Sequence, residues 1–340
     1  MTTQPLSALT MLLSRHTKRR EFITLLGGAA AWPLAARAQQ PMPVIGYLNQ
    51  GSPESDVSRL TGLRRGLSQT GYVEGRNLVI EYRWAGNQVD RLPALAVDLV
   101  QLRVAVIVAP GLLPALAAKA ATISIPIVFG VGADPVRSGL VASLNRPGGN
   151  LTGFNAFEGE LGAKGLALLH ELVPSITAVG FLENPNNPVN EFTTRDVLAA
   201  APAIGLKVQV LKAGTDRELD AAFVSLVQAR TGALLVVGDA FFNNRIEQIV
   251  ALAARHAIPT MYLFRDFAVA GGLISYGTSL IEVYRQVGLY AGRILKGEKP
   301  ADLPVIQTTK IELIINLKAA KTLGLEVPAK LLAIADEVIE

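Results

Sequence analysis

Few side chains in this chain have the types and spacing that catalysis or metal binding requires. Beyond residue 38 the only histidines are His170 and His256, and neither has a second histidine or a carboxylate at metal-ligand spacing on a helix. Cysteine is absent, which excludes a disulfide framework, thiolate metal sites and a cysteine nucleophile. The nucleophile motif G-x-S-x-G and the phosphate-binding motif G-x-x-x-x-G-K-[ST] are also missing. The residues therefore favour binding without a metal or cofactor over covalent chemistry.

The residues best placed to hold a ligand follow the predicted strands, because open parallel sheets bind ligands beyond the carboxyl ends of their strands. In the first half of the chain, the loop that starts at Asn49 and contains Ser52 has this position, and so does the loop at Gly111. Helix N-termini in such loops present unpaired N–H groups, so Ser52 and the backbone at Gly111 could hold a carboxylate. Simple helix capping is the competing interpretation for Ser52.

Two charged residues follow strands of the second half. Asp239 comes directly after an apolar run and precedes two phenylalanines, a setting that suits a ligand ammonium through ion pairing and cation–π contact. Its alternative role is the N-cap of the next helix. Arg265 could bind a ligand carboxylate with two hydrogen bonds or cover the surface.

Four further polar residues complete the candidate binding set. Asp134 precedes a proline and either contacts ligand or fixes its own loop by accepting backbone N–H bonds. Asn155 and Tyr276 lie where the chain is expected to cross between lobes, so each either contacts ligand or braces a linker. Asn184 lies in an asparagine-rich loop that faces the cleft or forms a plain turn.

The elements that must position these residues alternate between short β-forming runs and segments of helical periodicity. This alternation from residue 44 onward predicts α/β architecture with parallel sheets. Segment 77–84 alternates as a half-exposed strand near an edge does, whereas 104–109 and 125–130 are apolar almost throughout, as central strands are. Later strands are expected at 178–182, 206–211, 233–237, 259–263, 302–307 and 310–315.

Breaks rich in glycine divide the chain into two lobes. The segment NRPGGN at 145–150 cannot continue a helix, and we place a first crossing after it at 151–155. A second crossing is expected at 273–276, after Gly271 and Gly272. The expected division is therefore 41–153 plus 277–300 for lobe 1, and 154–276 plus 301–340 for lobe 2. Two lobes joined by short crossings form a hinge that can close over a ligand.

The segment KRREFITLLGGAAAWPLAARAQ at 18–39 has the layout of an export signal. Arg19 and Arg20 precede an uncharged run, and the sequence Ala-Arg-Ala that ends at Ala38 suits a signal peptidase. The run is shorter than the roughly 20 apolar residues of a membrane span. We expect a cleavable signal over 1–38, export to the periplasm and use of the twin-arginine machinery, with the general secretory route as the alternative.

The net positive charge of the chain comes from this leader. Of 32 basic and 28 acidic residues, the leader through Ala38 holds five and one, which leaves 27 of each. A neutral mature chain lacks the basic surface that nucleic-acid binding requires, so nucleic acid is not an expected partner.

Long stretches of the chain resemble one family. They are GYVEGRNLVIEYRWA from Gly71, IPIVFGVGADPV from Ile125, SGLVASLNRPGGNLTG from Ser138, AGGLISYG from Ala270, LKGEKPADLPV from Leu295 and INLKAAKTLGL from Ile315. The chain resembles the substrate-binding proteins of ABC importers of the tryptophan/tyrosine type. The resemblance implies the type I periplasmic-binding fold, with two Rossmann-like lobes, parallel sheets and a three-crossing hinge.

The resemblance also implies a function, the capture of a small organic ligand for an ABC permease and ATPase in the inner membrane. Relatives that bind aromatic amino acids tend to have Ser or Thr hydroxyls in the loops matching 109–113 and 132–134, and this chain has none there. Its ligand is therefore expected to be an amino acid, an aromatic acid or a similar molecule. Two alternatives remain, an exported cofactor-dependent enzyme and a ligand-sensing module for a membrane signalling partner.

Overall fold

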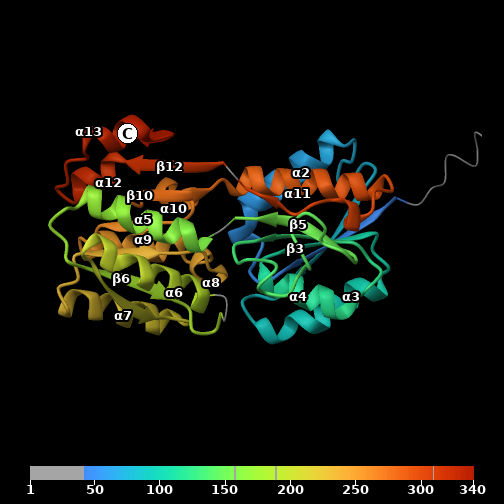
Figure 1. Ribbon diagram of the computed structural model, residues 1–340, viewed down its shortest axis with the longest axis horizontal. Coiled ribbons are helices and arrows are strands. Elements are labelled where there is room, and N and C mark those ends of the chain that lie inside the picture. The colour runs from blue at the N-terminus through green and yellow to red at the C-terminus, as the bar shows by residue number, and fades with distance from the viewer. Residues whose placement is uncertain (1–41, 157, 188–189, 309) are drawn as a thin grey trace, which may run out of the picture. The chain divides into compact units, whose positions relative to one another are not determined.

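The computed structural model describes residues 42–156, 158–187, 190–308 and 310–340 (Figure 1). Residues 43–340 form one compact unit. The expected signal, its arginine pair and the cleavage site near Ala38 lie outside the described residues.

The first sheet has six strands in the order β11-β5-β4-β3-β1-β2, and every neighbouring pair is parallel. Its strands are β1 (Val44–Asn49), β2 (Val79–Trp84), β3 (Val106–Pro110), β4 (Ile127–Val131), β5 (Leu151–Asn155) and β11 (Ile306–Gln307). One face packs against α2 (Val57–Gln69) and α11 (Leu280–Leu295), and the other against α3 (Leu92–Gln101) and α4 (Leu112–Ala121) (Figure 1). The expected edge position of segment 77–84 is confirmed, because β2 ends the sheet.

The second sheet has seven strands in the order β13-β12-β10-β9-β8-β6-β7. Its strands are β6 (Ala178–Glu183), β7 (Lys207–Lys212), β8 (Ala233–Val236), β9 (Thr260–Tyr262), β10 (Ile274–Thr278), β12 (Ile311–Asn316) and β13 (Glu337–Ile339). One core cluster involves α5 (Glu158–Leu172), α6 (Asn190–Ala200), α12 (Leu317–Thr322) and α13 (Ala329–Ile334), and the other α7 (Asp216–Gln228), α8 (Ala240–Asn243), α9 (Ile246–Arg255) and α10 (Arg265–Val269). Parallel pairing is confirmed except at β12, which runs antiparallel to β10.

We call the first sheet with its helices lobe 1 and the second sheet with its helices lobe 2. The chain passes between them after β5, between β10 and α11, and between β11 and β12, which makes the expected three crossings.

The positions of the crossings differ from those expected at 151–155 and 273–276. Both segments are strands, β5 and β10, that pair within their own sheets. Residues 154–155 and 301–307 thus go with lobe 1, where β11 pairs with β5, and residues 277–278 with lobe 2. Each glycine-rich break directly precedes the last strand before a crossing, and the crossing itself follows that strand. The lobe boundaries therefore differ from those expected.

Helices α2 and α11 approach closely because glycines line their contact. A Cβ on Gly66 would lie 1.9 Å from the carbonyl oxygen of Arg285, and one on Gly288 would lie 2.3 Å from that of Leu63. Real Cβ atoms essentially never come within 3.0 Å of such atoms, so any side chain there would push the helices apart. Because α11 follows the second crossing, this contact fixes the return of the chain to lobe 1.

We predict that Gly66→Ala lowers the free energy of unfolding by about 1–3 kcal/mol, the cost of overpacking a tight contact. Helix propensity alone would stabilise the variant by about 1 kcal/mol, so the sign of the change identifies the cause. Thr61→Ala, at an exposed position of the same helix, should change stability by less than about 0.5 kcal/mol. Urea unfolding followed by circular dichroism measures both, and a Gly66→Ala protein as stable as the parent would contradict the packing argument.

Candidate functional site

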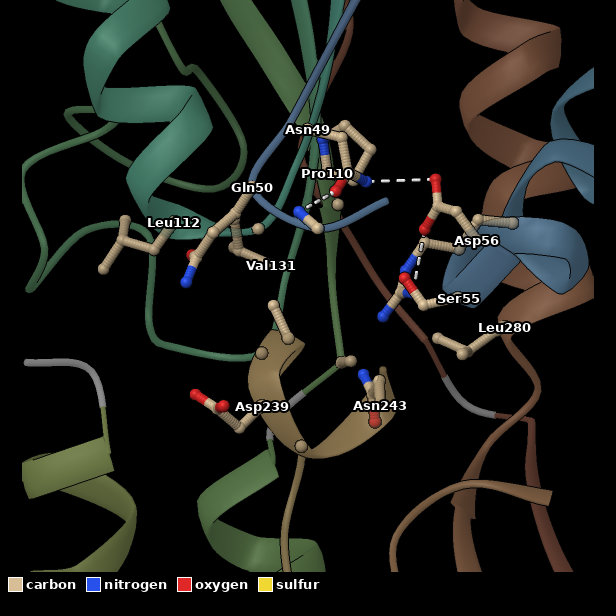
Figure 2. Close-up of a pocket in the computed structure, with 18 of the residues that line it drawn as sticks. Asn49, Gln50, Ser55, Asp56, Pro110, Leu112, Val131, Asp239, Asn243 and Leu280 are labelled. Carbon is tan, nitrogen blue, oxygen red and sulfur yellow. Dashed lines mark hydrogen bonds and ion pairs between the residues drawn. The ribbon is translucent and has the colours of Figure 1, made fainter. Parts of the chain in front are cut away.

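A cavity of about 110 Å³ lies beyond the carboxyl ends of strands from both sheets (Figure 2). Lobe 1 contributes the loops after β1, β3 and β4 and the start of α11, and lobe 2 contributes the loops after β6, β8 and β9. This is the sheet edge at which open parallel sheets bind ligands. At about 10–15 Å³ for each water, the cavity has room for roughly seven to eleven water molecules, the scale of one small organic molecule.

The lobe 1 wall is built around the buried carboxylate of Asp56, which is 1% exposed. Asp56 accepts hydrogen bonds from the Tyr47 hydroxyl, from Asn49 Nδ2 at 3.0 Å and from Arg59 Nη1 at 3.0 Å. Burial, followed by the charge of Asp56, raises the pKa of the Tyr47 hydroxyl well above its usual value. Tyr47 therefore remains a donor to Asp56 across the physiological pH range.

Arg59 links this wall to lobe 2. Its guanidinium lies over the rings of Tyr284 and Phe264, 5.7 Å and 5.9 Å from their centroids, and Phe264 belongs to lobe 2. Burial lowers the pKa of Arg59, but the Asp56 carboxylate together with Tyr284 and Tyr47 more than offsets that effect and leaves the pKa raised. Arg59 lines the cavity as a permanent cation. Its guanidinium has further N–H donors besides the Nη1 group that bonds Asp56.

The start of α4 gives lobe 1 a second set of donors. Gly111 precedes the helix with a φ of +93°, a conformation that favours glycine, and no side chain caps the helix. Leu112 and Leu113, the first two helical residues, line the cavity, and their N–H groups have no partner within the helix. The helix dipole adds partial positive charge at the same place, so this end suits a carboxylate.

Asp239 stands on the lobe 2 side of the cavity and is 3% exposed. Its Oδ1 accepts from the N–H of Phe241 at 2.8 Å, which caps α8, and from Asn184 Nδ2 at 3.0 Å. Its Oδ2 accepts from Asn187 Nδ2 at 2.7 Å. The capping interpretation is thus confirmed, and the same residue contributes a buried negative charge to the cavity wall.

Three of the nine candidate residues line the cavity, and they are Asn49, Gly111 and Asp239. The Asn49 side chain serves its own loop, because Oδ1 accepts from the N–H of Gly51 at 2.6 Å while Nδ2 bonds Asp56. Asp134 lies outside the lining and caps its own turn, accepting from the N–H groups of Val136 and Arg137.

The other candidates outside the lining have structural contacts. Asn155 is fully buried at the end of β5, and its carbonyl accepts from the N–H of Thr308, which joins the first and third crossings. Tyr276 lies within β10 and packs against both cores of lobe 2. Asn184 supports Asp239. Arg265 pairs with Glu337 at 2.7 Å and does not line the cavity.

The polar residues of the lining that the sequence analysis did not name include Gln50, Arg59 and Asn243. Arg59 stands three residues after Asp56, a spacing at which helical side chains meet, and this signal was available in the sequence. Gln50 and Asn243 had no such signal, because an isolated amide in a loop or at a helix end is common. Figure 2 shows them directed into the cavity from opposite lobes.

Polar side chains join the lobes beside the cavity. Asn244, the residue after α8, accepts from the Ser52 hydroxyl at 3.1 Å and donates to Asn87 Oδ1 at 3.0 Å. In addition, the Ser58 hydroxyl of α2 donates to the carboxylate of Asp266 in α10 and lies 3.0 Å from both of its oxygens. Ser52 is therefore a contact between lobes, a role that neither sequence interpretation included.

His170 and His256, the two histidines of the described residues, are not part of the cavity lining. His256 directly follows α9 and stacks on Phe223, and His170 lies in the last turn of α5. Among the described residues, no cluster of three or more potential metal ligands is found. Within the same residues, every helix is too short or too polar to cross a membrane.

The chain matches the family described as ABC transporter substrate binding protein over residues 52–339. It is similar to the tyrosine-binding protein of Clostridioides difficile (strain R20291), with 27% identity over 265 residues that cover 78% of this chain and 76% of that protein. Its structure is similar to an ABC domain from Streptococcus pneumonia in complex with L-Trp, with a TM-score of 0.80, 23% identity and coverage of 87% and 99%. It is also similar to the ligand-free, open structure of a substrate binding protein from Clostridium difficile, with a TM-score of 0.64, 26% identity and coverage of 88% and 99%.

The chain belongs to the ABC transporter substrate binding protein family, as the resemblance in its sequence indicated. Its two-lobe α/β fold is that of the type I periplasmic binding proteins. As a substrate-binding protein of an ABC transporter, it captures a small molecule.

We predict that Asn244→Ala opens the ligand-free protein, because it removes both hydrogen bonds that Asn244 makes to lobe 1. Each such bond contributes about 0.5–1.5 kcal/mol net, enough to shift an equilibrium between open and closed states several-fold. Small-angle X-ray scattering should show a larger radius of gyration for this variant. Asn145→Ala, an exposed change in lobe 1, is the control, and equal radii for Asn244→Ala and the parent would exclude this role.

Proposed function

We propose that this protein is the periplasmic component of an ABC importer and binds one small zwitterionic ligand of amino-acid size in the cavity between its lobes. The observation that supports this most directly is the opposite polarity of the two walls. Lobe 1 presents the uncapped N-terminus of α4 and the cation Arg59, whereas lobe 2 presents the buried carboxylate of Asp239. A carboxylate and an ammonium on one molecule would match these walls at once.

A ligand that contacts both walls would also explain closure. A ligand shifts the lobes only by its difference in affinity for the open and closed states. Because the donors and the carboxylate belong to different lobes, a zwitterion gains both interactions only when the lobes are closed. A ligand with one charged group would gain one interaction and close the protein less well.

The apolar residues that line the cavity determine which kind of ligand side chain fits. Pro110, Leu112, Val131, Phe264 and Leu280 give the cavity a largely apolar wall. The relatives include a tyrosine-binding protein and an L-Trp complex. We infer that the ligand carries a mostly apolar or aromatic side chain, and that backbone N–H groups at α4 replace the hydroxyls that relatives tend to have there.

Delivery and location complete the proposal. The captured ligand passes to a membrane permease driven by an ATPase, and the protein itself performs no covalent chemistry. The arginine pair and the small residues before Gln39 support export by the twin-arginine route and cleavage near Ala38.

A thermal-shift screen of the purified protein tests the function. Amino acids, aromatic acids and nucleosides are added singly, and a true ligand at about 100 times its Kd adds roughly 2.7 kcal/mol of stability. We expect one or a few amino acids to raise Tm strongly. If no compound in a broad library stabilised the protein, the receptor function would be rejected.

Asp239→Asn tests the charge in lobe 2. Asparagine keeps an acceptor for the N–H of Phe241 and so preserves the cap of α8, but it removes the negative charge. We expect affinity for an amino acid to fall at least about tenfold, as loss of a charged hydrogen bond of about 1.5–3 kcal/mol requires. Affinity for the matching acid without the amine should change little.

Isothermal titration measures both ligands. Asp220→Asn, an exposed change on α7, controls for the substitution itself. Equal loss of affinity for the amino acid and its amine-free analogue would show that Asp239 acts only through the structure of its loop.

A further inference from the structure

We propose that Gln50 makes the cavity specific for α-amino acids, because its one side-chain amide bonds both charged groups of such a ligand. Its Nε2 donates to the ligand carboxylate, and its Oε1 accepts from the ligand ammonium. The inference rests on the proposed function and narrows it from zwitterions in general to those that carry both charged groups on one carbon.

Gln50 lies where the order of strands in the first sheet reverses. In that order β2 lies on one side of β1 and β3 on the other. The loops that leave such a pair of strands diverge and form a crevice, which is where open parallel sheets bind ligands. Gln50 directly follows β1, and Gly111 directly follows β3 at the start of α4. The Gln50 amide and the N–H groups that suit a carboxylate therefore border one crevice, and both line the cavity.

The side chain of Gln50 is buried, yet its amide has no hydrogen-bond partner within the described part of the chain. The residue is 8% exposed. The unpaired polar atoms that protein encloses completely include Asn243 Oδ1 but neither atom of the Gln50 amide. The amide therefore keeps accessible surface, and Figure 2 shows the side chain directed into the cavity. Because buried polar groups in native proteins are nearly always paired, this amide is placed for a partner that enters the cavity.

The backbone that carries this side chain is held in place. The carbonyl of Gln50 accepts from the N–H of Asn87 at 2.7 Å, and that of Gly51 accepts from the N–H of Gly86 at 3.0 Å. The N–H of Gly51 donates in turn to Asn49 Oδ1. Only the side-chain torsions of Gln50 remain to be ordered when a ligand binds, which lowers the entropic cost of the contact.

The amide lies between groups of opposite charge. Figure 2 shows Gln50 on the side of the cavity where Leu112 and Asp239 are drawn, away from Asp56 and Leu280. Leu112 begins α4, whose N–H groups suit a carboxylate, and Asp239 offers a negative charge to an ammonium. A glutamine amide has a donor and an acceptor side by side, and these match the two charged groups of an α-amino acid. When those groups are further apart on the ligand, one amide no longer reaches both.

The neighbouring polar side chains of the lobe 1 wall are already paired within the protein. Asn49 bonds Gly51 and Asp56, and the Ser55 hydroxyl donates to the carbonyl of Ser52. Arg59 has donors only, so it cannot accept from an ammonium. Gln50 is therefore the residue of this wall that offers a ligand both a donor and an acceptor.

Analogues that lack one charged group test the proposal on the intact protein. The standard L-amino acids are titrated singly into the parent by isothermal titration calorimetry, and the tightest binder is then compared with two analogues. One analogue lacks the amine and keeps the carboxylate, and the other lacks the carboxylate and keeps the amine. Displacement of the amino acid measures an analogue that binds weakly.

Gln50→Met keeps the length of the side chain and removes both polar atoms. We expect affinity for the amino acid to fall roughly a hundredfold and affinity for each analogue roughly tenfold, because two bonds to charged groups are lost in the first case and one in the second. The preference of the parent for the amino acid over its β-amino isomer should fall with them. Gln101→Met, an exposed change at the end of α3, should leave every affinity unchanged.

Gln50→Glu distinguishes ligand contact from a structural role. Glutamate keeps an acceptor for an ammonium but replaces the donor with a negative charge. Affinity for the amine-free acid should fall at least about tenfold, whereas affinity for the carboxylate-free amine should rise. A residue that acted only through its loop would change both affinities in the same direction.

The outcomes separate this inference from the proposed function. Unchanged affinity for the amino acid in Gln50→Met, or equal losses for the amino acid and both analogues, would refute the role of Gln50 and leave the receptor function intact. A carboxylate-free amine that binds Gln50→Glu no better than the parent would refute the bond to the ammonium. If no amino acid bound the parent, the proposed function would fail and this inference with it.

Discussion

The buried carboxylate of Asp56 is the interaction on which the lobe 1 side of the cavity depends. It draws together the end of β1 through Tyr47 and Asn49 and the first turn of α2 through Arg59. Removing one partner of a buried ion pair costs about 3–5 kcal/mol, because the other charge is then left buried without a partner. Because Arg59 also lies over Phe264 of lobe 2, the same carboxylate fixes the cation that meets the other lobe when the protein is closed.

On the lobe 2 side, the short helix α8 has a comparable role, although it is only four residues long. Asp239 caps its start, so one carboxylate both orders the turn and places a negative charge in the wall. Asn243 and Asn244 at its end face the cavity and lobe 1 respectively. Such a short helix has little stability of its own, and its order comes from these side chains. Ligand recognition and closure are therefore properties of the same turn.

Most of the fold was predictable from the sequence, because buried parallel strands and amphipathic helices leave clear periodicities. The edge strand β2 and the central strands β3 and β4 follow directly from their patterns. The antiparallel β12 and the exact crossings were not predictable, because strand direction and partner depend on contacts across the fold. The ends of the strands located the cavity correctly. Individual side chains such as Arg265 were uncertain, because a distant residue, Glu337, decides where the guanidinium lies.

The contacts between the lobes must be strong enough to favour closure and weak enough to allow release of the ligand. The two bonds of Asn244 each contribute about 0.5–1.5 kcal/mol net, and the bond of Ser58 to the Asp266 carboxylate contributes about 1.5–3 kcal/mol. A few such bonds favour closed lobes without preventing release, because they break easily. Stronger contacts would trap the lobes together and exclude ligand, whereas weaker ones would make the ligand supply all the free energy of closure and so reduce its affinity. Polar bonds of moderate strength beside an amphipathic cavity therefore suit a receptor that must bind its ligand and then release it.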